Sequence, residues 1–134
     1  MDDKIKTYLN QLNKIEKEIC ELLIILIDNE LLDSESKVWH AHPVWFLNGN
    51  PIVGFSKQKR GVRLMFWSGL DFEEESLNVI GSKFKDASIF YNHVSEIEIE
   101  SVKRCLNKSI EIQWDYKNLI KRKGVLEKLY LNKC

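Results

Sequence analysis

The residues best suited to chemistry lie close together in the segment VWHAHPVWFLNGNPIVGF, at positions 38–55. One residue, Ala41, separates His40 from His42, so on a single strand their two imidazoles would point to the same face. A transition metal can use such a pair, with His93 or a carboxylate as the third ligand. The alternative is that both histidines only support a small sheet.

A second candidate is an aromatic and basic surface. We predict that Trp39, Trp45, Arg63 and Trp67 line a ligand-binding groove on the sheet. A sheet with one solvated face should alternate between apolar and polar residues, yet these strands are apolar on both faces. Either helices cover both faces, or one face is an open aromatic groove that receives a small molecule or a protein partner.

The acidic residues Glu73, Glu74 and Glu75 are a third candidate. Carboxylate oxygens suit iron, and a weak surface site of this kind could release the metal again. The alternative is a solvated helix terminus, because an aspartate followed by acids fits the positive end of a short helix over about 72–80.

Hydrophobic periodicity predicts the helices and strands that position these residues. Residues 4–32 carry an apolar stripe at helical spacing and form one helix, or two with a kink near 10–13. Residues 97–123 are also predicted to be helical, although IEIQW at 110–114 could alternatively be a strand. Gly124 then ends this second long helix.

Alternating hydrophobicity predicts an antiparallel meander in the middle of the chain. The expected strands are 37–47, 50–57, 61–68 and 87–91. Asn48-Gly49 is a favoured type I′ hairpin pair, because both central residues need positive φ. A two-residue turn there would pair Val44 with Val53 and place Trp39 and Trp45 on one face.

We therefore predict a single α+β domain over residues 1–134. A small antiparallel meander is packed by a long N-terminal and a long C-terminal helix. The expected core comprises Leu12, Ile15, Ile19, Leu22, Leu26, Val53, Leu64, Phe66, Val102 and Leu106.

Composition narrows the function classes. The 134 residues carry 20 basic and 20 acidic side chains, so no global field attracts nucleic acid or a membrane. The longest apolar run is too short to span a bilayer, and three widely spaced cysteines indicate a reduced cytoplasmic protein. No nucleophile or phosphate-binding motif is recognisable, which favours a binding protein over an enzyme. The oligomeric state stays open.

Two segments resemble a known family. HAHPVWFLNGNPIVGFSKQKRGVRLMF and KDASIFYNHVSEIEIESVKRCLNKSI resemble the core and the C-terminal half of the YdhG-like family of small bacterial domains of unknown function. The resemblance rests on Pro43 before Trp45, the hairpin glycine Gly49, and the apolar strands that follow. One member has been described as a frataxin-like intracellular iron chaperone. The resemblance therefore implies an iron-binding role, with iron as cargo, and identifies fold better than function.

Overall fold

Two helices begin the chain. A computed structural model describes residues 2–131 and places α1 at Asp3–Asn10 and α2 at Lys14–Glu30. The Asp2 carboxylate caps α1, and Asn13 caps α2 in a reciprocal capping box with Glu16. Of the two alternatives for residues 4–32, the interrupted helix is therefore correct.

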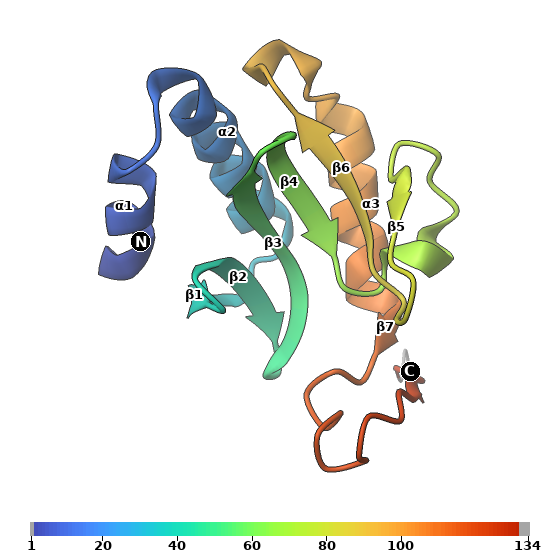
Figure 1. Cartoon of the computed structure of the whole chain (residues 1–134). Coiled ribbons are helices and arrows are strands. Elements are labelled where there is room, and N and C mark those ends of the chain that lie inside the picture. Colours follow the sequence, from blue (N-terminus) through green and yellow to red (C-terminus); the bar gives the residue numbers. More distant parts are fainter. Residues whose placement is uncertain (1, 132–134) are drawn as a thin grey trace.

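The centre of the fold is a six-stranded sheet with every neighbouring pair antiparallel, in the order β1-β2-β3-β4-β6-β5 (Figure 1). The strands are β1 Glu35–Trp39, β2 His42–Leu47, β3 Asn50–Gln58, β4 Gly61–Phe66, β5 Val79–Ile80 and β6 Ala87–Tyr91. Together with three α-helices, this sheet confirms the predicted α+β class and meander.

Apolar residues of the three helices gather on one face of the sheet. In β4, Val62, Leu64 and Phe66 are buried in the core that the helices share, whereas Arg63 and Met65 alternate with them and are half-buried. We call the first face the helix-covered face and the second the open face. Most of the predicted core is confirmed, but Ile15 is 49% exposed because it lies in the first turn of α2.

The register of the β2–β3 hairpin differs from the prediction. Asn48 and Gly49 have positive φ, and Phe46 pairs with Pro51, as expected. An irregularity between Trp45 and Phe46 then shifts the register by one residue, so Val44 pairs with Gly54 rather than Val53. Before the irregularity, each β2 residue therefore lies on the opposite face, relative to β3, from the one that the two-residue turn predicts. Trp45 consequently lies on the helix-covered face.

The predicted strand 37–47 is wrong, because the chain reverses in its middle. His40 and Ala41 have φ of 51° and 71° and form a tight turn between β1 and β2. Positive φ at both central residues of a two-residue hairpin is the geometry of a type I′ turn, for which alanine is a poor residue.

The predicted helix over 72–80 is also wrong. A short 3₁₀ turn, η1 at Gly69–Phe72, ends at Glu73, which adopts a left-handed φ of 56°. The chain then runs through a loop into β5 at Val79–Ile80. Acidic residues in sequence therefore did not open a helix here, because their local preference is weak compared with the tertiary contacts of Glu74 described below.

The C-terminal region is a helix followed by a small hairpin rather than one long helix. After a 3₁₀ turn, η2 at Val94–Glu96, α3 spans Ile99–Glu111, and β7 at Gln113–Trp114 pairs with β8 at Lys128–Leu129. The alternative of a strand within 110–114 is thus correct for its last two residues.

Two cysteines lie inside the core. Cys20 and Cys105 are buried free thiols, and burial raises their pKa to about 12 and about 11. They act as small apolar residues, as predicted, whereas Cys134 lies outside the described residues. Within residues 2–131, no helix combines the length and hydrophobicity that crossing a membrane requires.

Candidate functional site

Three aromatic side chains meet on the open face of the sheet. The ring of Trp39, at the end of β1, lies 5.5 Å from that of Phe46 and 6.2 Å from that of Trp67, measured between centroids. Gly54 makes room for this cluster: a Cβ there would lie 3.3 Å from the Trp67 ring and 2.7 Å from the carbonyl oxygen of Pro43. The absence of a side chain at Gly54 lets the indole lie against the strand.

The aromatic cluster forms one wall of a cleft of about 440 Å³, which we call the aromatic cleft. The residues of the opposite wall come from the loop before β6 and from the segment after β7: they are Phe84, Tyr116, Lys117, Leu119 and Ile120. Phe84 and Tyr116 pack edge to face, and the Tyr116 hydroxyl accepts a hydrogen bond from the Lys85 N–H. Burial raises the pKa of Tyr116 to about 12, so its hydroxyl stays protonated.

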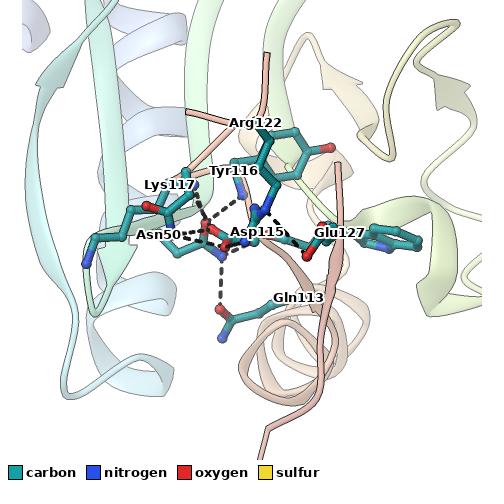
Figure 2. A network of polar contacts seen from close by, with 9 residues as sticks. Asn50, Gln113, Asp115, Tyr116, Lys117, Arg122 and Glu127 are labelled. Atoms are coloured by element: carbon teal, nitrogen blue, oxygen red, sulfur yellow. Dashed lines mark hydrogen bonds and ion pairs between the residues drawn. The ribbon is translucent and has the colours of Figure 1, made fainter. Parts of the chain in front are cut away.

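A single buried asparagine fastens this second wall to the sheet. The Asn50 side chain, 3% exposed, donates to the Gln113 side chain and the Trp114 carbonyl at 3.1 and 3.0 Å. Its oxygen accepts from the backbone N–H groups of Tyr116 and Lys117, both at 3.0 Å (Figure 2). All four hydrogen-bonding positions of the amide are therefore used, and the segment after β7 is held beside the Asn48-Gly49 turn.

The rest of this segment is held by a buried carboxylate. Asp115 accepts hydrogen bonds from the backbone and side chain of Asn118 and pairs with Arg122 at 2.7 Å (Figure 2). Burial opposes ionisation of Asp115, but the bonds from Asn118 and the Arg122 guanidinium lower its pKa overall. Arg122 also reaches Glu127 at 3.4 Å, which joins the segment to the chain that returns into β8.

The charge of the aromatic cleft is positive. Its lining includes Lys37 and Lys117 and, within residues 2–131, no carboxylate. Lys37 Nζ lies 4.8 Å from the centre of the Phe46 ring, and Lys117 Nζ donates to the Asn48 carbonyl oxygen at 3.1 Å. A cleft with aromatic walls and cationic edges suits a flat ligand that carries a negative group.

No family model and no curated protein matches the chain. Among solved structures, it is similar to a crystal structure of YdhG from Bacillus subtilis, a protein of the DUF1801 family, with a TM-score of 0.63. The match covers 90% of this chain and 92% of that chain, at 14% sequence identity. The chain has the fold of YdhG. This likeness agrees with the resemblance seen in the sequence and concerns the fold alone.

Three of the four predicted ligand-binding residues lie on the open face of this YdhG-like fold. Trp39 and Trp67 line the aromatic cleft, and Arg63 lies farther along β4 beside a neighbouring pocket. Trp45 is instead 1% exposed on the helix-covered face, where its indole N–H donates to the Asp28 carboxylate at 2.8 Å. Two features cause this separation. The turn at His40-Ala41 pairs Trp39 with His42 and so keeps Trp39 on the open face. The register shift between Trp45 and Phe46 pairs Trp45 with Val53, on the helix-covered face.

The prediction that the two histidines share one strand face is wrong. His40 lies in the turn, with its ring 4.2 Å from that of Trp39, whereas His42 is the first residue of β2. In the part of the chain that the structure describes, no three His, Cys, Asp or Glu side chains are grouped so that they could hold a metal ion.

The three predicted glutamates lie together beside α3. Glu73, Glu74 and Glu75 line an open depression that also includes Glu98 and Glu100. Glu74 is not free there, because its carboxylate is hydrogen-bonded and ion-paired with Arg104 and Lys108. The hydrogen bonds from Arg104 lower the pKa of Glu74 to about 2, aided by those from Lys108.

The second wall of the cleft was not predicted from the sequence. Phe84, Tyr116 and Lys117 come from segments that we predicted to be loop and helix. A partial signal was present in Asp115 and Asn118, because an aspartate that bonds the residue three positions later marks a turn rather than a helix interior.

Proposed function

We propose that the protein is a non-enzymatic binding protein for a small molecule with a flat apolar ring and an acidic group, held in the aromatic cleft. The observation that carries this proposal is the pair of half-buried tryptophans, Trp39 and Trp67, facing a wall of further apolar residues. The volume of about 440 Å³ is that of a small-molecule site, and it is small for a protein partner.

Each part of the cleft has a role in this proposal. The Trp39 and Trp67 rings offer faces on which a flat group can stack, and Phe84 with Tyr116 closes the other side. Lys37 and Lys117 at the edges attract the acidic group and favour it over a neutral analogue. We place this activity in the reducing cytoplasm, which the buried free thiols of Cys20 and Cys105 support.

A matched pair of fluorescent probes tests the proposal. 8-Anilinonaphthalene-1-sulfonate carries the flat rings and an acidic group, and N-phenyl-1-naphthylamine carries the same rings without the acid. We expect one molecule of the sulfonate to bind per chain, and Trp39→Ala or Trp67→Ala to weaken binding about tenfold or more. Lys37→Gln with Lys117→Gln should weaken the sulfonate but not the amine.

Phe90→Ala is the control, because Phe90 lies on the open face but outside the cleft, under the Arg60 guanidinium. Affinity that stays unchanged in both tryptophan variants would overturn the proposal. Native mass spectrometry of the purified protein then gives the mass of any ligand that it carries.

An iron chaperone, implied by the resemblance, is the second candidate. The observation that favours it is the depression with Glu73, Glu75, Glu98 and Glu100 around its edge. Against it, these glutamates are not among any group of three side chains placed to hold a metal ion within residues 2–131. The central carboxylate of Glu74 is also already neutralised by Arg104 and Lys108. Anaerobic calorimetry with iron(II) tests the idea: binding should be lost when Glu73 and Glu75 become Gln, and unchanged heat in that variant would rule this cluster out.

A further inference from the structure

A second pocket lies next to the aromatic cleft, where the open face meets the edge of β3 and helix α1. It has a volume of about 270 Å³ and lies at the turn between β1 and β2. The side chains that matter to its chemistry are Tyr8, His40, His42, Ser56, Lys57 and Arg63. His40 belongs to both pockets, and its ring against Trp39 separates them.

The charge of this pocket is one-sided. No aspartate or glutamate lines it within residues 2–131, whereas Arg63 and Lys57 do. Their counter-charges lie outside the lining: Asp86 is 3.4 Å from Arg63 Nη2, and Glu16 is 3.6 Å from Lys57 Nζ. Both are ion pairs at part-exposed positions, so the two cations are balanced from outside the pocket, while the charged groups of the lining itself are all positive.

Two hydroxyl groups at the pocket keep a hydrogen for which no acceptor is found among residues 2–131. Tyr8 Oη accepts a bond from the Lys57 N–H at 2.8 Å, which leaves its own hydrogen available. Ser56 Oγ likewise accepts from Gln58 at 3.1 Å and keeps its hydrogen. Burial raises the pKa of Tyr8, so this hydroxyl remains a donor at neutral pH.

Two further groups lack partners. His42 Nδ1 is buried and makes no well-formed hydrogen bond to the described residues, although the Pro43 backbone interacts with the ring. The bonds of Arg63 to Ser88, Met65 and Asp86 use Nε and Nη2, which leaves Nη1 to donate to a ligand. A buried polar atom without a partner is costly, so a bound acceptor would stabilise this arrangement.

We propose that this pocket is a separate binding site for a small oxyanion, a phosphate or carboxylate group. Arg63 holds it, with donors from Tyr8, Ser56 and the Nδ1–H tautomer of His42. An oxyanion supplies acceptors and negative charge together, which is what the pocket lacks. The proposal does not depend on a ligand in the aromatic cleft, because the lysines of that cleft are not part of it.

Titration with inorganic phosphate, followed by NMR of the amide and Arg Nε–H signals, tests the proposal. We expect saturable shifts at residues 54–58 and at Arg63, complete by about 10 mM phosphate. Arg63→Gln should weaken binding at least about tenfold, and Arg63→Lys less, because one charge is kept without the planar fork. Acetate that displaces phosphate would indicate a carboxylate site as well, and acetate that fails to compete would restrict the site to phosphate.

Tyr8→Phe and Ser56→Ala keep the test valid if Arg63→Gln is unstable, since each removes one donor at a part-exposed position. Arg60→Gln is the control and should bind phosphate as the parent protein does. Shifts that do not saturate, or that persist equally in Arg63→Gln and Tyr8→Phe, would overturn the proposal. Failure of the naphthalene probes to bind would leave these phosphate results unaffected.

Discussion

The two faces of the sheet are built from similar aromatic residues but differ in how deeply those residues are buried. On the helix-covered face, Trp45, Phe55 and Phe66 are buried against the three helices. On the open face, Trp39 and Trp67 remain half-buried, and the loop before β6 and the segment after β7 border them. The difference teaches that an aromatic residue serves stability or recognition according to what covers it, not according to its type.

The largest expected contrast between the faces is in stability. Trp45→Ala should lower the free energy of unfolding by about 3–5 kcal/mol, because it leaves a cavity and removes the hydrogen bond to Asp28. Trp39→Ala, its matched partner on the open face, should cost about 1 kcal/mol. Guanidinium unfolding measures both values. Equal losses would show that the open face is as much a part of the core as the covered one.

The next effect concerns the segment that borders the open face. Asn50→Ala removes four hydrogen bonds and should cost about 2–3 kcal/mol. The Gln113 side-chain oxygen and the Lys117 N–H lose their partner, whereas the Tyr116 N–H and the Trp114 carbonyl still bond each other. Hydrogen exchange should accelerate first at the amides of Tyr116 and Lys117, before those of α2. Asn107→Ala, at an exposed asparagine of α3, is the control. Uniform acceleration across the chain would mean that the segment and the core unfold together.

On the covered side, Glu74 should make a pH-dependent contribution to the free energy of unfolding. Its pKa falls from 4.5 to about 2 on folding, so its stabilising effect is fully present above pH 4.5 and is lost as the pH falls towards 2. Glu74→Gln should flatten the fall in stability over this window. Glu73→Gln, the exposed neighbour, is the control, and urea unfolding from pH 2 to 7 is the measurement. An unchanged profile in Glu74→Gln would show that the contacts with Arg104 and Lys108 do not hold α3 in place.

The smallest effect has the opposite sign and lies at the edge of the open face. Ala41 has a φ of 71°, which glycine adopts freely, so Ala41→Gly should raise stability by about 0.5–1 kcal/mol. Ala87→Gly is the matched control: Ala87 is buried in β6, and glycine should destabilise it. Thermal unfolding distinguishes the two signs. Destabilisation by Ala41→Gly would mean that the strain of the turn is offset by contacts of the Ala41 methyl group.

Several candidate site residues can be identified in the sequence, but their arrangement cannot. Trp39, Trp67 and Arg63 do lie on one face, as predicted, but Trp45 does not. His40 and His42 were expected on a common strand, yet a turn lies between them. Neither error could be corrected from the residues alone, because the irregularity at Trp45/Phe46 and a His-Ala type I′ turn have no strong local signature.

What the sequence by itself determined is the set of locally encoded features. The Asp2 and Asn13 caps, the Asn48-Gly49 turn and the strand at 87–91 follow from the conformations that these residues prefer. Only the tertiary structure decided which face each aromatic residue meets and what lies over the open face. One inserted residue in a strand reverses its faces, and the wall from Tyr116 to Ile120 is held by Asn50, more than 60 residues earlier in the chain. Such long-range contacts are decided by packing, which local preference does not encode.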